Sequence, residues 1–137
     1  MIENKLLLKE QIKYIVIHCS DTSESDCAED IHKLHLSFGW EGIGYHKIIK
    51  QNGRIENGRP EFWVGAHVYG FNNESLGICL IGKTNFKKKQ FITLKKLLLQ
   101  WKIKYPSAKI LGHKDTGNTN KTCPNFDVIT WSRNKFL

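Results

Sequence analysis

Short apolar runs alternate along this chain with segments of helical periodicity, and together they predict an α/β fold. Residues 14–17 are β-branched or aromatic and are bounded by polar residues, which indicates a buried strand that ends at His18. Residues 76–81 carry apolar side chains on both faces, as a central strand does. Residues 108–111 are predicted to form a third strand, and His113 follows it. These three segments are the expected core strands of one sheet.

The first helix is expected over residues 27–38, where apolar side chains recur every three or four positions. Asp26 with Glu29 three residues on is typical of a variant capping box at the start of a helix. Gly39 occupies the position just past the helix end, where glycine is favoured.

A second helix is predicted to end at Pro106, and a third is predicted to begin after Asp127, which suits an N-cap. The third contains Ile129 and Trp131. The apolar face of the second consists of Leu94, Leu97, Leu98, Trp101 and Tyr105.

A hairpin is predicted between the first helix and the central strand. Residues 45–50 and 54–56 are its strands, and the intervening Asn52-Gly53 pair is a strong turn signal. Residues 57–75 are rich in Gly and Asn and are predicted to form a loop at the rim of a site. The element order therefore predicts a central mixed β-sheet flanked by helices, with residues 1–137 as a single domain.

Composition narrows the class of protein. The chain is 40% hydrophobic and 25% charged, which fits a compact globule and excludes disordered, collagen-like and coiled-coil chains. Its apolar runs fall far short of the roughly 20 residues that span a bilayer. The N-terminus lacks the apolar core of a secretory signal, so synthesis and retention in a cytoplasm are expected.

The formal charge of +8 favours an anionic partner such as nucleic acid, an acidic membrane or a wall polymer. The basic residues are scattered, and the densest cluster, residues 87–89, is interpreted as solvated surface. Direct nucleic-acid binding is not expected, because no known binding motif is present.

His18 and His113 each follow a predicted strand, where side chains can converge at a sheet edge, and Cys123 comes ten residues after His113. Two imidazoles and a thiolate are the ligands of a catalytic zinc that keeps a fourth position open. The spacing alone is weak evidence, and a nucleophilic cysteine with a histidine base is an alternative. Cys19 would suit that role too, but alternation along a strand should turn it away from His18.

The other cysteines and two of the histidines are interpreted as structural. A disulfide framework is not expected in a reducing compartment. Cys79 lies in an apolar strand and is expected in the core, whereas Cys27 opens a helix without an evident partner. His32 and His35 lie within the first helix.

Seven ordered motifs between about Tyr14 and Trp131 resemble the zinc-dependent N-acetylmuramoyl-L-alanine amidases, the family shared by small phage endolysins and peptidoglycan recognition proteins. The likeness is greatest to the phage endolysins. The motifs are IHCSDT at 17–22, GW at 39–40, GYHKII at 44–49 with GRIE at 53–56, GAH at 65–67, NESLGI at 73–78, GH at 112–113 and KTCPNFD at 121–127.

The resemblance implies roles for individual residues. His18, His113 and Cys123 match the family's zinc ligands. Tyr45 matches a tyrosine that assists the zinc-bound water, and Lys121 a lysine that stabilises the oxyanion in the phage branch. Two further histidines match positions at the substrate groove: these are His67, lining it, and His46, just behind it.

The resemblance also implies one Zn²⁺ per chain, peptidoglycan as the partner, and hydrolysis of the amide between N-acetylmuramic acid and L-alanine. Without a signal peptide, an endolysin of this kind would reach the wall by a holin-type route, and we expect a monomer. An alternative is a binding protein that mainly inhibits a phage RNA polymerase; in one phage amidase of the family, the N-terminal region helps to bind and inhibit that enzyme. Residues 1–13 have no clear counterpart, so this second activity does not transfer directly.

Overall fold

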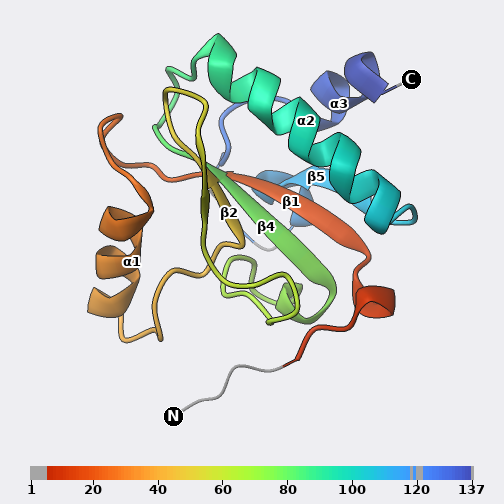
Figure 1. The fold of residues 1–137 in the computed structure, drawn as a ribbon, viewed down its shortest axis with the longest axis horizontal. Helices are drawn as coiled ribbons and strands as arrows, with labels where there is room; N and C mark the ends of the chain where they lie inside the picture. Colours follow the sequence, from red (N-terminus) through yellow and green to blue (C-terminus); the bar gives the residue numbers. More distant parts are fainter. Residues whose placement is uncertain (1–5, 118, 120–121, 137) are drawn as a thin grey trace.

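The computed structural model describes residues 6–117, 119 and 122–136. It contains a five-stranded sheet with helices on both sides (Figure 1). The strands are β1 (Tyr14–Cys19), β2 (Lys47–Ile49), β3 (Ile55–Asn57), β4 (Ser75–Leu80) and β5 (Lys109–Gly112). The α-helices are α1 (Ala28–Ser37), α2 (Lys88–Lys104) and α3 (Val128–Phe136). Short 3-10 helices are η1 (Lys9–Gln11), η2 (Asn72–Glu74) and η3 (His113–Thr116).

The sheet is mixed, as the sequence predicts. Its strand order is β3-β2-β4-β1-β5, with β2, β4, β1 and β5 parallel and only β3 antiparallel to its neighbour. β4 lies in the centre, and all six of its residues are buried. Burial on both faces explains why its sequence is an unbroken run of apolar and small residues.

The two faces of the sheet are covered by different helices. α2 packs its buried residues Leu94, Leu98 and Trp101 into the larger core cluster on one face. On the other face, Ile31 of α1 packs into a smaller cluster with Ile48 of β2. Figure 1 shows α1 and α2 on opposite sides of the strands.

The start of α1 differs from the expected cap. Cys27, not Asp26, is the N-cap residue, and its backbone N–H donates to Oδ2 of Asp30 at 2.9 Å. The N–H of Ala28 donates to the carboxylate of Glu56 in β3 at 2.7 Å, so the hairpin is anchored to the helix start. A carboxylate at this end is favourable because the N-terminal amides carry partial positive charge.

Two strand boundaries also differ from the prediction in ways that affect the site. β2 begins at Lys47, so Tyr45 lies in the loop before the strand and not within it. β1 continues to Cys19, so His18 is paired inside the sheet, opposite Cys79 of β4. The sequence pattern ends the strand at the last apolar residue, so it does not predict that His18 and Cys19 continue it. In the structure, pairing with the neighbouring parallel strands buries both residues.

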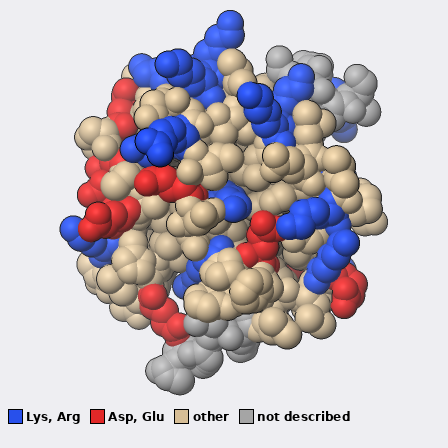
Figure 2. Space-filling view, in the orientation of Figure 1, with Lys and Arg blue, Asp and Glu red and all other residues tan. Residues whose placement is uncertain are grey.

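Charge is spread unevenly over the surface. In Figure 2, Lys and Arg side chains are concentrated along the upper and right parts of the molecule, where α2 lies in Figure 1. None of the helices in the described part of the chain combines the length and the hydrophobicity that a bilayer span requires.

Candidate metal centre

The register of the sheet brings His18 and His113 together. β1 and β5 are parallel, and Ile17 is opposite Gly112. The next residue in each chain segment is a histidine, so both imidazoles emerge at the same edge, with ring centroids 4.7 Å apart. Parallel strands are joined by long crossover connections, so residues far apart in the sequence can lie side by side at the same edge. His18 and His113 are 95 positions apart.

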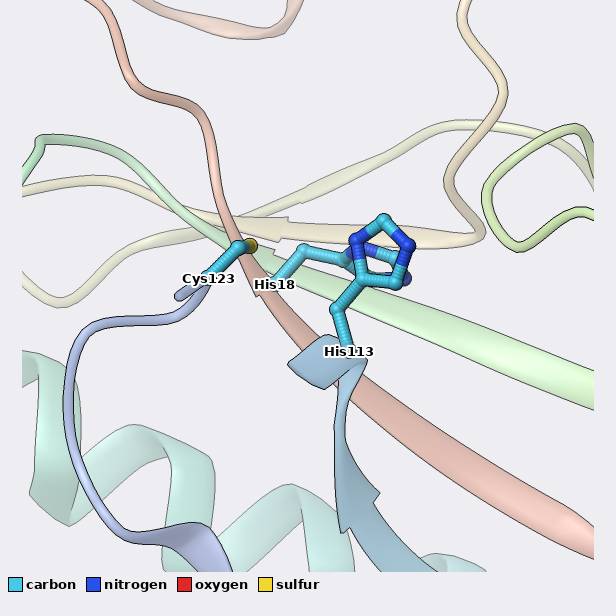
Figure 3. Close-up of side chains that lie close together, drawn as sticks. All are labelled: His18, His113 and Cys123. Carbon is cyan, nitrogen blue, oxygen red and sulfur yellow. The ribbon is translucent and has the colours of Figure 1, made fainter. Parts of the chain in front are cut away.

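Cys123 completes a group of three possible metal ligands. It lies in the loop before α3, and its thiol points toward the two histidines (Figure 3). One ligand atom from each of His18, His113 and Cys123 lies within 4.8 Å of the others. His18 is buried, whereas the other two are partly accessible, so the group opens to solvent on one side.

A chain of hydrogen bonds fixes the tautomer of His18. The hydroxyl of Ser75 donates to the carbonyl of Phe71 at 2.8 Å, so its oxygen accepts from Nε2–H of His67 at 3.2 Å. Nδ1 of His67 is then an acceptor, and Nε2–H of His18 donates to it at 2.9 Å. This arrangement leaves the lone pair on Nδ1 of His18 for a metal, as a hydrogen bond from the other ring nitrogen does in many metal sites.

Two glycines make room for the imidazole of His67. A Cβ atom at Gly77 would lie 2.7 Å from its Nδ1, and one at Gly65 would lie 2.7 Å from its Cδ2. Real Cβ atoms essentially never approach so closely, so only glycine fits at either position with His67 in place. Both glycines belong to motifs that the sequence analysis singled out.

Cys19 lies beside Cys123 at the end of β1. Its Sγ is 3.6 Å from Sγ of Cys123, and its backbone N–H donates to the same sulfur at 3.1 Å. Cys19 is the last residue of β1, and the loop that contains Cys123 packs across that end of the strand. The pKa of Cys123 is raised by its hydrogen bond with Cys19 and by burial, so a thiolate at this position requires a compensating positive charge.

Two histidines at the site, His18 and His67, are held neutral. Burial lowers the pKa of His18 well below its ordinary value, and His67 and His113 lower it further. The pKa of His67 is lowered by burial and then by His46 and His113. Neutral imidazole is the form that binds a metal, so protons do not compete for the lone pair of His18 near pH 7.

Tyr45 borders the same site from the loop before β2. Its ring centroid is 5.0 Å from that of His18. Burial, followed by the nearby cysteines, raises the pKa of Tyr45 well above 10, so it carries its proton at neutral pH. A protonated phenol at this position is a hydrogen-bond donor.

These residues lie at the bottom of a groove of about 960 Å³. Its walls come from α1, the loop after it and the segment between β3 and β4, and they include Phe38, Trp40, His67 and Tyr69. A cavity of this size and mixed polarity fits a ligand larger than a single amino acid. Lys121, the proposed oxyanion-stabilising residue, lies outside the described residues.

The remaining histidines serve the backbone. Nδ1 of His32 and of His35 accept from the N–H groups of Ile43 and Gly44, at 3.0 and 2.9 Å, which confirms their structural interpretation. His46 is fully buried behind His67: its Nδ1 accepts from Gly77 at 3.0 Å and its Nε2 bonds the carbonyl of Trp63 at 2.8 Å.

Comparison with known proteins identifies the family. Residues 8–126 match the model of the N-acetylmuramoyl-L-alanine amidase family. The chain belongs to this family. It is 36% identical to the endolysin of Escherichia phage T7 over 133 residues, covering 90% of this chain and 87% of that protein. The endolysin of Klebsiella phage KP32 is 35% identical with the same coverage.

Solved structures of an amidase and of a peptidoglycan recognition protein share the fold. The N-acetylmuramoyl-L-alanine amidase LysC from Clostridium intestinale URNW superposes with a TM-score of 0.82 at 29% identity, covering 96% of this chain and 89% of that one. The bumblebee peptidoglycan recognition protein PGRP-SA has a TM-score of 0.84 at 28% identity, covering 98% and 87%. The resemblance inferred from the motifs is therefore confirmed, and the protein is an N-acetylmuramoyl-L-alanine amidase.

Sequence reasoning missed two contributors to this amidase site. Ser75 fixes the orientation of His67 through one hydroxyl. It lies within the motif NESLGI at 73–78, but the sequence analysis gave it no role of its own. Cys19 was considered only as a partner of His18, whereas the structure places it beside Cys123.

Proposed function

We propose that the amidase binds one Zn²⁺ through His18, His113 and Cys123 and cuts the amide between N-acetylmuramic acid and L-alanine. The observation that carries the proposal is the group of three donor atoms within 4.8 Å. Two imidazoles and a thiolate suit zinc in chemistry and number, since catalytic zinc sites use three protein ligands and leave one position open. The partly accessible side of the group faces the groove, where a substrate can enter.

Zinc bound there would supply a water of pKa about 7 and polarise the scissile carbonyl, which an unreactive amide requires. The chain's own residues prepare this site. His67 acts as a positioning residue. Its Nδ1 accepts a hydrogen bond from Nε2–H of His18, which directs Nδ1 of His18 to the metal position. Ser75 in turn holds the tautomer of His67.

Tyr45 is proposed to donate a hydrogen bond to the reacting oxygen. Its raised pKa keeps the phenol protonated, so it can stabilise negative charge as it develops on the carbonyl oxygen. Lys121 is proposed to add a positive charge at the same oxygen. This second role follows from its position two residues before Cys123 and from the family motif alone.

At the level of biology, we propose that the protein is an endolysin, like the phage proteins it resembles. It would act as a single domain and as a monomer on peptidoglycan, with a holin-type route to the wall. A net charge of +8 favours its approach to an anionic wall.

The direct test is to incubate the protein with purified peptidoglycan and quantify newly released L-alanine amino termini. We expect release that stops with a zinc chelator and returns when zinc is restored. Release that persists in chelator and stops on alkylation of Cys19 or Cys123 would instead indicate a thiol nucleophile. No release from wall material of several chemotypes would contradict the proposed substrate.

A further inference from the structure

The outward face of α2 has a pattern that the amidase site does not use. At 100° per residue, the exposed side chains Ile92, Leu99 and Ile103 fall within an arc of about 40° on this helix. They are 46%, 47% and 82% exposed, on the side opposite Leu94, Leu98 and Trp101, which enter the core. α2 thus has a second, narrow apolar stripe that faces solvent.

Lysines flank this stripe on both sides. Lys88 and Lys95 lie along one edge and Lys89 and Lys96 along the other, each pair seven residues apart. All four side chains are exposed, and within the described part of the chain none of them has an acidic partner at ion-pair distance. α2 contains six lysines and no Asp or Glu. Figure 2 shows this basic character along the line of α2.

We propose that this face of α2 is a docking surface for an anionic phospholipid bilayer. A helix that lies in the headgroup region buries a narrow apolar stripe among the upper acyl chains. Lysines beside the stripe can lay their methylene stems along the apolar region while their ammonium groups contact lipid phosphates. A purely ionic partner, such as a soluble wall polymer, would give no use to Ile92, Leu99 and Ile103.

The fold makes this surface compatible with catalysis. α2 covers one face of the sheet, whereas the groove is lined by α1 and by loops at the ends of the strands. The chain can therefore rest on a bilayer through α2 while the groove stays open. Docking involves none of the metal ligands, so it does not depend on zinc.

The test is co-sedimentation of the whole protein with phosphatidylglycerol vesicles and with phosphatidylcholine vesicles. We expect binding to the anionic vesicles, weakened by salt, and little binding to the zwitterionic ones. Removing two charges by Lys95→Gln with Lys96→Gln should weaken binding on the order of thirtyfold, since each lysine near a charged membrane contributes about one kcal/mol. The matched control, Lys9→Gln with Lys33→Gln, removes the same charge from other surfaces and should have little effect.

A second pair of variants tests the apolar stripe at constant charge. Leu99→Gln with Ile103→Gln should weaken vesicle binding, whereas Leu6→Gln with Leu36→Gln, two exposed leucines elsewhere, should not. All variants should keep the far-ultraviolet circular dichroism of the wild type. Equal binding to both lipids, or unchanged binding by the Leu99 and Ile103 pair, would overturn the proposal. Self-association that Ile103→Gln abolishes would instead assign the face to a second copy of the chain.

Discussion

The six histidines of this chain fall into two groups that differ in what their ring nitrogens contact. His32, His35 and His46 accept hydrogen bonds from backbone amides of the loop after α1 and of β4. At the strand ends, His18 instead bonds another imidazole, that of His67, and its ring centroid lies 4.7 Å from that of His113 in a tilted arrangement. The first group uses its lone pairs to hold the fold, whereas His18 keeps one for a metal.

The difference shows that burial alone does not identify a functional histidine. His46 is as buried as His18, and the pKa of each is lowered by burial. What separates them is the partner. The N–H of Gly77 occupies the lone pair on Nδ1 of His46. His67 instead orients His18 through Nε2 and leaves the lone pair on Nδ1 of His18 available.

The largest effect should come from removing a metal ligand. His113→Ala is expected to lower amidase activity on the order of a thousandfold or more, because a two-ligand site cannot hold zinc tightly. The free energy of unfolding of the metal-free protein should change little, since His113 is only partly buried. Activity within tenfold of the wild type would remove His113 from the metal site.

The histidines that bond the backbone should respond in the opposite way, with a loss of stability. His46→Ala leaves the buried N–H of Gly77 and the carbonyl of Trp63 without their partner, which should cost about 3 kcal/mol of unfolding free energy. Denaturant titration of the metal-free variant would measure the loss. A full loss of stability in His113→Ala, with none in His46→Ala, would reverse the division between the groups.

His46 and His35 should contribute to the pH dependence of stability, alongside His18 and His67, whose pKa values burial also lowers. The pKa of His46 is lowered from 6.5 to about 4 by burial, and that of His35 is also lowered to about 4. The unfolded chain therefore binds protons that the folded chain does not, and stability falls as the pH drops from about 6.5 toward 4. His46 alone should account for about 3 kcal/mol of this loss.

Unfolding midpoints in urea between pH 7.5 and pH 4.5 would measure this slope. His46→Gln removes the titrating group, so its curve should be flatter than that of the wild type. Parallel curves for the two proteins would mean that His46 titrates normally and that its burial has no electrostatic cost.

A smaller effect should separate positioning from simple packing at His67. In His67→Asn the amide oxygen can take the place of Nδ1, which His18 contacts; in His67→Gln the amide takes the place of Nε2, which contacts Ser75. We expect zinc affinity to fall about 10- to 100-fold in the Gln variant and much less in the Asn variant. Equal zinc affinities of the two variants in a competition titration would show that the hydrogen bond from His18 to His67 does not orient His18.

Much of the fold was predictable because the strands are apolar and the helices periodic. The mixed sheet, α2 with its buried Leu94 and Trp101, and the cap at Asp127, which accepts from Thr130 N–H at 3.1 Å, all follow from local pattern. The errors arose where a tertiary contact overrides that pattern. Cys27 caps α1 because Asp30 reaches its N–H, and β1 extends through His18 because β4 pairs with it.

The metal ligands were predicted as a set through the family motifs, not through their spacing. Position along the strands indicated that His18 and His113 would meet, but only the register of β1 against β5 shows why. The approach of Cys19 to Cys123 depends on how the loop before α3 packs, and no residue pattern encodes that contact.

The most direct test of the account is a calorimetric titration of zinc into the metal-free protein. We expect one zinc per chain, bound tightly by the wild type and by Cys27→Ala. In Cys123→Ala the zinc affinity should fall by about a hundredfold or more. Cys27 is a matched control because it caps α1 away from the three ligands. Binding by Cys123→Ala at the wild-type affinity, or no binding by the wild type, would contradict the assignment of His18, His113 and Cys123 as the zinc site.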